Sequence, residues 1–216
     1  MKDNPLERLA EWLDEARTES SRRNPLAMAL ATCSAQGTPS VRMVLAKDFC
    51  TATGHIVFYT NFGSRKAAEL DATARAAGVI YWEEFGGRQL RIEGPVTRAP
   101  SSDADAYFAR RPAASQLNAW VSEQSRPLVD DESLNVAAAD KAAEFGLDYA
   151  RLDPSSPAEI PRPDHWGGYR LWIERVEFWN EGAGRFHDRV LYSRTLDLRV
   201  TPSGAANDWQ MIRLQP

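Results

Sequence analysis

The stretch AMALATCSAQGTPSVRMVLAK, residues 27–47, decides the fold class of this chain. Two apolar runs, at 27–33 and 40–47, flank the turn sequence QGTP at 36–39. Short apolar runs separated by glycine and proline are typical of antiparallel strands joined by a tight turn. The stretch therefore predicts one strand, a turn and a second strand.

The same pattern continues towards the C-terminus. Between Ile173 and Val176 the spacing of the apolar residues shifts, which predicts a bulge within one long strand. Gly86-Gly87 indicates a hairpin. Many short strands without alternating strand–helix units favour an antiparallel barrel over a doubly wound sheet. The further strands are expected at 55–60, 78–83, 88–97, 168–179, 185–194 and 209–214.

Helices are expected to flank these strands. Asn4 and Pro5 are typical of a helix start, and Leu6, Leu9 and Leu13 follow helical spacing. The proline-rich stretch 153–163 predicts an extended crossing segment. We predict a mainly β protein with flanking helices, of the α+β class, that forms a single domain over 1–216. Other helices are expected at 63–76, 102–110 and 130–145, the N-terminal helix and its connection occupy 1–23, and the crossing segment lies in 147–165.

Composition narrows the partners to small molecules. The net charge is −4, so the chain lacks the excess of Lys and Arg that nucleic acids and anionic membranes require. No apolar run approaches the roughly 20 residues of a membrane span. Cys33 and Cys50 form a poor disulfide framework for a chain of this size, which favours a reducing compartment. We therefore predict a cytoplasmic protein.

The chain lacks several common catalytic motifs. His55, His165 and His187 do not have metal-ligand spacing, so no metal site is predicted. No G-x-S-x-G elbow, dinucleotide fingerprint or phosphate-binding lysine loop occurs. With no obvious nucleophile or acid–base pair, a bound organic cofactor would have to supply the difficult chemistry.

Three segments carry candidate anion-binding cations. Ser64-Arg65-Lys66 lies at a strand-to-helix turn, where free backbone N–H groups favour an anion; a capped surface helix with solvated charges is an equal alternative. In 185–189, Arg185, His187 and Arg189 would share one strand face, which suits an anion better than a charged edge strand. In 42–47, the last residue, Lys47, is by itself best interpreted as a solvated edge residue.

Taken in order, the motifs of this chain resemble those of the pyridoxine 5′-phosphate oxidase family. Each motif alone is weak, but the ordered set covers nearly the whole sequence. The motifs are Arg42 to Lys47, Tyr59-Thr60, Ser64 to Lys66, Arg88-Gln89, Tyr107 with Arg111 and Ser115, Trp120 to Ser125, Trp166 to Gly168, Phe178-Trp179, Arg185 to Arg189, and Trp209 to Pro216.

The resemblance implies a split β-barrel, antiparallel and of Greek-key type, that forms a homodimer with FMN at the subunit interface. One subunit would supply most flavin contacts, and the other would supply Gln124, Ser125, Trp179 and Arg189. The contacts from the first subunit would be Arg42, Met43, Val44, Leu45, Lys47, Tyr59, Thr60, Arg65, Lys66 and Gln89.

The resemblance also implies the reaction. The family oxidises the 4′-amine or 4′-alcohol of pyridoxamine or pyridoxine 5′-phosphate by hydride transfer to the flavin. Dioxygen accepts the electrons, so the products are pyridoxal 5′-phosphate, hydrogen peroxide and, from the amine, ammonia. Arg185 and His187 would be the catalytic residues beside the pyridine ring. The substrate contacts would be Lys47, Tyr107, Arg111, Ser115, Arg185 and His187.

Two alternatives share the same fold. A related flavin oxidase of phenazine biosynthesis has the barrel, the FMN motifs and the Arg-x-His pattern. Lys47 and the set Tyr107, Arg111 and Ser115 argue against it, because a phenazine precursor has no phosphate ester to hold. The second alternative is a non-catalytic carrier of FMN or pyridoxal phosphate.

Overall fold

The predicted strand–turn–strand at 27–47 is present in the computed structural model, which describes residues 4–128, 130–198, 205–206 and 208–216. Strand β1 (Ala27–Cys33) pairs antiparallel with β2 (Pro39–Leu45), with Ala27 opposite Leu45 and Cys33 opposite Pro39. The prediction of this hairpin is confirmed, although β2 ends at Leu45 and Lys47 lies beyond it.

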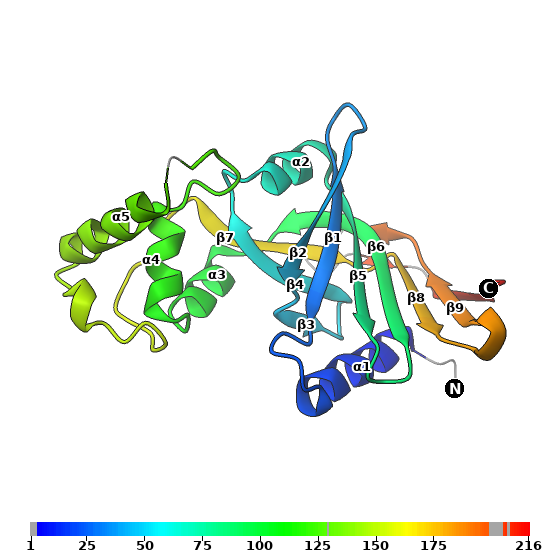
Figure 1. Ribbon diagram of the computed structural model, residues 1–216. Helices are drawn as coiled ribbons and strands as arrows, with labels where there is room; N and C mark the ends of the chain where they lie inside the picture. Colours follow the sequence, from blue (N-terminus) through cyan, green and yellow to red (C-terminus); the bar gives the residue numbers. More distant parts are fainter. Residues whose placement is uncertain (1–3, 129, 199–204, 207) are drawn as a thin grey trace. The chain divides into compact units, whose positions relative to one another are not determined.

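Within the described residues, ten strands form one antiparallel sheet and two short strands form a second. The main order is β12-β9-β8-β6-β5-β1-β2; β4 pairs with β3 and β7, and β7 also pairs with β6. The expected α+β class with an antiparallel sheet is confirmed (Figure 1). The remaining strands are β3 (Asp48–Cys50), β4 (His55–Asn61), β5 (Arg75–Trp82), β6 (Arg88–Arg98), β7 (Trp166–Trp172), β8 (Arg175–Asn180), β9 (Asp188–Ser193), β10 (Leu196–Asp197), β11 (Ala205–Ala206) and β12 (Gln210–Arg213).

The chain divides into two compact units. The sheet unit contains the described residues of 4–58, 69–97 and 170–216, and the helical unit contains those of 59–68 and 98–169. Because strands β4 and β7 contribute residues to both units, neither unit is a continuous segment. Whether the two units act as the single domain expected from the sequence stays a prediction.

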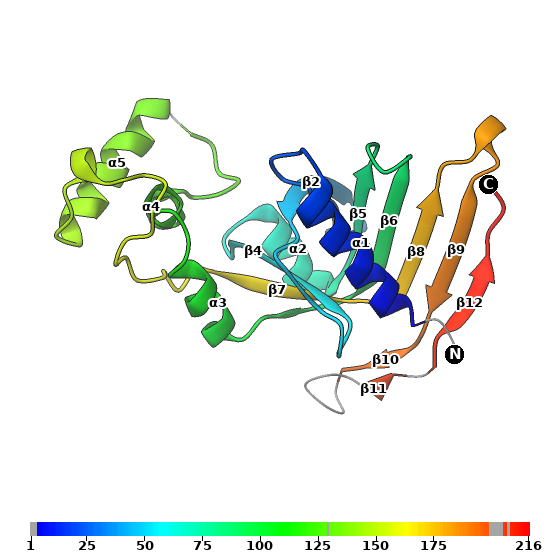
Figure 2. The same ribbon diagram turned by 90° about the horizontal axis from the view of Figure 1, so that it is seen from below.

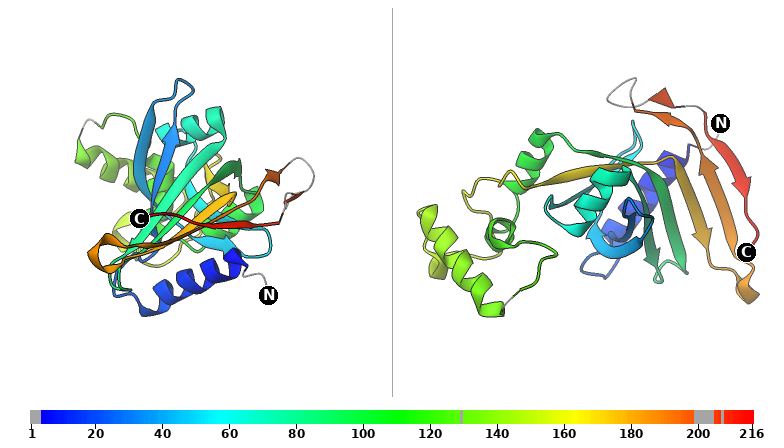
Figure 3. Two further views of the ribbon diagram at one scale, coloured as in Figure 1. Left: turned by 90° about the vertical axis from the view of Figure 1, so that its right-hand side faces the viewer. Right: turned by 90° about the horizontal axis from the view of Figure 1, so that it is seen from above.

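Helix α1 (Pro5–Glu19) covers one face of the sheet unit (Figure 2). Its N-cap is Asn4, whose side chain accepts a hydrogen bond from the backbone N–H of Leu6, as the sequence predicts. The leucines spaced along it are buried. Trp12 packs edge-on against Phe178 of β8, with ring centroids 5.0 Å apart. At the edge of the sheet, β12 lies beside β9 (Figure 3).

The prediction of one bulged strand over 168–179 is wrong. The chain forms two strands, β7 and β8, which both pair with β6. The break lies at Ile173-Glu174, where the backbone N–H of Glu174 donates to the carbonyl of Glu93. A Cβ on the neighbouring Gly94 would lie 1.8 Å from the Trp172 carbonyl oxygen, so only glycine allows this approach. The shift in apolar spacing therefore marks a strand break.

Two other boundaries differ from the prediction. Helix α2 (Arg65–Thr73) ends three residues early, because Ala74 takes a left-handed backbone conformation with φ 52° and β5 begins directly after it. The strand expected at 185–194 begins only at Asp188. Residues 185–187 belong to the loop between β8 and β9, which contains the short 3₁₀ turn η2 (Ala183–Arg185).

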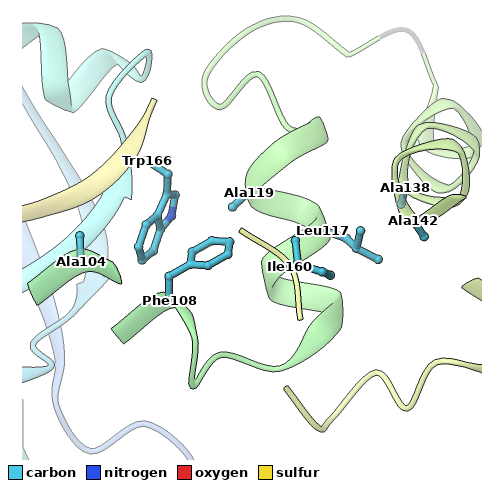
Figure 4. Packing of buried hydrophobic residues seen from close by; sticks show 8 residues of the cluster. All are labelled: Ala104, Phe108, Leu117, Ala119, Ala138, Ala142, Ile160 and Trp166. Carbon is cyan, nitrogen blue, oxygen red and sulfur yellow. The ribbon is translucent and has the colours of Figure 1, made fainter. Parts of the chain in front are cut away.

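The helical unit has its own apolar core (Figure 4). Its helices are α3 (Ser101–Phe108), α4 (Ala113–Val121) and α5 (Asp131–Glu144), followed by the 3₁₀ turn η1 (Tyr149–Arg151); α4 was not predicted. Phe108, Leu117 and Trp166 are buried in this core. The buried Gln116 of α4 donates to the Phe108 carbonyl and accepts from the Ala158 N–H, which ties the crossing segment to the helices.

Candidate functional site

The predicted site residues lie in both units. The helical unit holds Tyr59, Thr60, Arg65, Lys66, Tyr107, Arg111, Ser115, Gln124 and Ser125, and the sheet unit holds Arg42, Met43, Val44, Leu45, Lys47, Gln89, Trp179, Arg185, His187 and Arg189. Within each unit the structure brings several of these side chains together. The division of residues between a subunit and its partner stays a prediction.

A buried lysine forms the first group, in the helical unit. Lys66 is only 8% exposed, and its ammonium lies 3.0 Å from Thr60 Oγ1, 3.2 Å from Ser64 Oγ and 2.5 Å from Gln124 Oε1. These three oxygens are neutral acceptors that orient the ammonium. A cation oriented in this way, away from bulk water, attracts an anion strongly.

The N-terminus of α2 adds backbone donors to the lysine group. Here the N–H of Arg65 donates to Ser125 Oγ over 3.3 Å. Ser125 has a left-handed backbone with φ 74°, a conformation that is uncommon for a residue other than glycine and is frequent at ligand sites. In this chain Gln124 and Ser125 therefore contact Thr60, Arg65 and Lys66 of the same subunit. A pocket of about 370 Å³ beside them is lined by Asn61, Gly63, Trp120, Ser122, Glu123, Gln124, Arg126 and His165.

Arg111 forms the second group of the helical unit, at the N-terminus of α4. Its guanidinium lies over the ring of Trp166, 4.5 Å from the centroid. Burial lowers its pKa from the ordinary value, and nearby Tyr107 partly opposes this shift. Nη1 of Arg111 is buried and has no hydrogen-bond partner among the described residues. A buried N–H without a partner costs about 1–3 kcal/mol, so an anionic oxygen placed here would be strongly favoured.

Aromatic rings fix the surroundings of Arg111. The ring of Tyr107 stacks on Tyr59 with centroids 4.2 Å apart, and Tyr59 stacks on Trp166 at 5.4 Å. Tyr107 comes from α3, and Ser115 lies in the first turn of α4. The N–H groups of Ala113, Ala114 and Ser115 already donate to the carbonyls of Ser156, Pro154 and Pro112, so the start of α4 offers an anion its dipole only. Of the residues that the sequence assigned to a phosphate ester, Tyr107 therefore lies beside the unpaired donor of Arg111, Ser115 lies in the following helix, and Lys47 belongs to the sheet unit.

In the sheet unit, three predicted flavin contacts form one row. The strand register places Gln89 of β6 opposite Trp179 of β8, and Trp179 opposite Arg189 of β9. Side chains at paired positions point to the same face of a sheet. Nε of Arg189 donates to the buried carboxylate of Glu177 over 2.7 Å, and this contact raises the pKa of Arg189. The arginine is therefore permanently charged and held in one direction.

Side chains along strand β2 alternate between the two faces of the sheet. Val41 and Met43 are exposed, whereas Arg42 and Val44 are half-buried on the other face. Arg42 donates to Thr32 Oγ1 and Ser40 Oγ and forms an ion pair with Glu69. Lys47, which follows the strand, lines a pocket of about 260 Å³ together with Arg17, Arg23, Asn24, Pro25, Leu26, Leu45 and Ala46.

The expectation that Arg185, His187 and Arg189 share a strand face is wrong. Arg185 and His187 lie in the β8–β9 loop, and only Arg189 lies in the strand. A Cβ on Gly182 would lie 1.8 Å from the Phe186 carbonyl oxygen, so glycine lets the loop fold back on itself. His187 Nδ1 accepts from the Gly182 N–H over 3.3 Å, and its ring packs 4.5 Å from Trp179.

Arg185 combines exposure with an uncommon backbone. Its φ is 67°, so it is in the left-handed region that disfavours side chains, and the side chain is exposed. Strain of this kind costs on the order of 1–3 kcal/mol and is typical of functional loops. Ser125 and Arg185 are two of the three non-glycine residues with positive φ in the described part of the chain. Both are predicted site residues.

Comparison with known proteins identifies the family. Residues 14–142 match the family model described as pyridoxamine 5′-phosphate oxidase, and residues 166–216 match that of the pyridoxine 5′-phosphate oxidase C-terminal dimerisation region. This chain belongs to the pyridoxamine 5′-phosphate oxidase family. It is therefore an enzyme of an FMN-dependent oxidoreductase family that acts on a small molecule, and the recognition made from the sequence is confirmed.

Individual relatives agree with this assignment. The chain is 41% identical to the pyridoxine/pyridoxamine 5′-phosphate oxidases of Brucella canis and Mesorhizobium japonicum, over 98% of this chain and 94% and 92% of theirs. It is 32% identical to PhzG from Burkholderia lata, solved with tetrahydrophenazine-1-carboxylic acid, at a TM-score of 0.81 over 98% of this chain and 92% of that one. An FMN-binding protein from Nostoc punctiforme, 19% identical with full coverage and a TM-score of 0.71, shares the fold.

None of the helices in the described part of the chain is long and apolar enough to cross a membrane. Likewise, no three His, Cys, Asp or Glu side chains in the described ranges are grouped to hold a metal ion.

Sequence reasoning missed the residues that hold the site residues in place. Glu69, Glu177 and Gln116 are buried polar side chains that contact site residues or their neighbours. No motif includes them, because their partners come from strands and helices distant in the sequence. A polar residue within an otherwise apolar run, such as Glu177 before Phe178-Trp179, is the one signal that could have indicated burial with a partner.

The geometry around Lys66 gives a prediction. Replacing Lys66 by methionine should raise the FMN dissociation constant about 10- to 100-fold, because a charge-assisted hydrogen bond contributes about 1.5–3 kcal/mol. Flavin fluorescence titration of the apoprotein measures this change. The control is Lys141→Met, which removes a lysine of α5 that pairs with Glu144. Equal affinities of wild type and the Lys66 variant would contradict the role of Lys66.

Proposed function

We propose that this enzyme oxidises pyridoxamine 5′-phosphate and pyridoxine 5′-phosphate to pyridoxal 5′-phosphate with dioxygen as the acceptor. The alcohol reacts with one dioxygen to give the aldehyde and hydrogen peroxide. The amine also consumes one water and releases ammonia. Family membership and the identity to curated oxidases support this proposal.

The arrangement of Arg111 is the observation on which the proposal rests. Its buried Nη1 lacks an acceptor among the described residues, and it lies next to Tyr107 and just before helix α4. A phosphate ester has enough oxygens to accept from the guanidinium and from nearby hydroxyls together. Lys66 and its neighbours form a separate cationic group in the same unit. Two phosphates, one of the flavin and one of the substrate, account for two groups.

The residues present fit FMN. Lys66 and the α2 N-terminus would hold its phosphate, and Arg42, Gln89, Trp179 and Arg189 would contact the rest of the cofactor. When bound, FMN supplies the two-electron chemistry that no side chain of the protein can perform. The protein holds the substrate ring in place and positions its 4′ carbon, a contribution that is entropic and orientational.

We assign the catalytic roles to the β8–β9 loop. Arg185 would polarise the 4′ substituent through a hydrogen bond that its guanidinium donates, and His187 would orient the pyridine ring. The Gly182 N–H donates to His187 Nδ1, so the neutral ring carries its proton on Nε2 and presents it away from the backbone. The exposed position of Arg185 leaves its guanidinium accessible to a ligand.

We also propose that the active enzyme is a homodimer with shared active sites. Residues 166–216, which match the family's dimerisation region, include Trp179, Arg185, His187 and Arg189. An interface formed by this region would therefore lie next to site residues. A monomer that bound stoichiometric FMN and turned over at full rate would contradict this arrangement.

The test is to purify the protein, record its visible spectrum, and add pyridoxine 5′-phosphate in air. We expect a yellow protein that forms aldehyde and peroxide in equal amounts, and pyridoxamine 5′-phosphate should give ammonia in addition. A protein that bound no flavin even after FMN was supplied would overturn the proposal. A yellow protein inert towards both phosphates would favour a non-catalytic carrier or the second candidate below.

The second candidate is a phenazine-type oxidase. The likeness to Burkholderia PhzG favours it, since a carboxylate like that of the ligand in that structure could also pair with Arg111. A carboxylic acid offers fewer acceptor oxygens than a phosphate ester, so the group around Arg111 favours the phosphate. Oxidation of a dihydro- or tetrahydrophenazine carboxylic acid without oxidation of the vitamer phosphates would establish this candidate.

A further inference from the structure

A buried carboxylate on α2 holds Arg42 of β2. We propose that Glu69 is a positioning residue for the flavin: it fixes the guanidinium of Arg42 so that its remaining N–H is directed at FMN. This inference rests on the proposed function, because it takes Arg42 to be a flavin contact. All the residues that carry it belong to the sheet unit.

Three donors converge on one oxygen of Glu69. Its Oε2 lies 2.5 Å from Thr32 Oγ1, 2.6 Å from Ser40 Oγ and 3.2 Å from Arg42 Nη2. Glu69 is buried. Each hydroxyl has a single hydrogen, which it donates to the carboxylate, so each hydroxyl oxygen is free to accept from Arg42.

Arg42 completes the network from the other side. Its Nη1 donates to Thr32 Oγ1 and, over 3.3 Å, to the carbonyl of Leu30, and its Nη2 donates to Ser40 Oγ. These contacts and the bond to Glu69 occupy both terminal nitrogens, and Nε remains for a ligand. The Arg42 side chain is 21% exposed and that of Glu69 is 6% exposed, so the arginine lies between the carboxylate and solvent.

The contacts of Glu69 are better explained by positioning of the Arg42 guanidinium than by a structural link between strands and helix. Neutral residues could join β1, β2 and α2 without burying a charge, which is costly unless the charge is paired. The pair of Arg42 and Glu69 has no net charge, so Arg42 would add direction to flavin binding more than attraction. A long side chain that is already immobilised loses little further entropy when the ligand binds.

The same design occurs a second time in the sheet unit. Glu177 and Glu69 are the two buried carboxylates of the described residues, and each binds an arginine assigned to the flavin. Glu177 accepts from Arg189 Nε over 2.7 Å and from Arg91 Nη1 over 2.8 Å. Two independent occurrences favour a role in cofactor binding over an accident of packing.

The test measures FMN affinity of the apoprotein by flavin fluorescence. Glu69→Ala should raise the dissociation constant about tenfold, the effect of freeing one long side chain. Glu69→Gln keeps an acceptor oxygen and should stay within about threefold of wild type. The matched control, Glu93→Ala, removes a partly exposed carboxylate that pairs with Arg91 and Arg175 and should leave the affinity unchanged.

A double-mutant cycle separates positioning from a structural role. In an Arg42→Ala background, Glu69→Ala should produce no further change in FMN affinity, because Glu69 acts through Arg42. An equal loss in both backgrounds would overturn the proposal. If Glu69→Ala does not fold, Ser40→Ala takes its place in the cycle, with an expected change of about threefold that also vanishes without Arg42.

FMN binding by the wild type and by the Glu69→Ala variant tests the proposed function and the positioning role separately. A wild-type protein that binds no FMN would defeat the proposed function itself. A wild type that binds FMN together with a folded Glu69→Ala variant of equal affinity would defeat the positioning role alone. Thermal unfolding of each apoprotein, followed by circular dichroism, establishes that the variants compared are folded.

Discussion

Replacing Arg111 by methionine should raise the KM for pyridoxine 5′-phosphate about 10- to 100-fold and leave kcat and FMN content nearly unchanged. The buried Nη1 of Arg111 lacks a partner, so the phosphate oxygen that accepts from it contributes a charge-assisted hydrogen bond. The phosphate is remote from the reacting carbon. Its binding is therefore the same in the ground state and the transition state, and its loss appears in KM. Steady-state kinetics at saturating dioxygen measure both constants.

A control variant and a substrate without phosphate serve as controls for the Arg111 prediction. The neighbouring Arg110 is exposed and bonds the carbonyl of Ala106, so Arg110→Met should leave KM within about twofold of wild type. Pyridoxine without its phosphate should react equally slowly with wild type and Arg111→Met. A variant that lost as much activity towards pyridoxine as towards its phosphate would show that Arg111 does not hold the phosphate.

The sequence predicts best what local chemistry determines. The N-cap at Asn4, the buried leucines of α1 and the β1–β2 hairpin all depend on residues within a few positions of one another, and all three are confirmed. The cations at the start of α2 are predictable for the same reason, because a helix N-terminus and its charges are adjacent in sequence.

The errors arise where distant segments decide the local conformation. The break between β7 and β8 depends on Gly94 of β6, about 80 residues earlier in the chain, which allows the Trp172 carbonyl to approach. Arg185 and His187 alternate with Phe186 as in a strand, yet Gly182 and the left-handed Gly184 and Arg185 turn the segment into a loop. Alternation in three residues is too short to outweigh such backbone requirements.

The site was predicted as a set of residues rather than as an arrangement. The resemblance named Arg42 and Arg189, but only the structure shows that buried Glu69 and Glu177 hold them. Likewise, the missing acceptor of Arg111 depends on burial, which no motif reports. A list of motifs therefore gives the ligand's chemistry, whereas the partners that fix each side chain come from the folded chain.

Replacing Arg185 by glycine should lower kcat at least about 100-fold, the usual contribution of a positioned proton-transfer or polarising group. The backbone at Arg185 is left-handed, which glycine adopts without strain. Relief of about 1 kcal/mol of strain should offset the greater entropy that glycine gives the unfolded chain, so the free energy of unfolding should stay within about 1 kcal/mol of wild type. The rate of substrate oxidation in single turnovers without dioxygen, together with urea unfolding, measures both quantities.

The neighbouring Phe186 provides the matched control. It is 81% exposed in the same loop, and Phe186→Ala should change kcat by less than about threefold if the loop's shape is retained. An Arg185→Gly enzyme that kept its FMN and turned over at the wild-type rate would remove Arg185 from the mechanism. Loss of FMN in parallel with turnover would instead assign the residue to cofactor binding. The left-handed backbone of Arg185 thus predicts a specific result. Loss of this side chain should hardly change the free energy of unfolding, and it should remove most of the turnover.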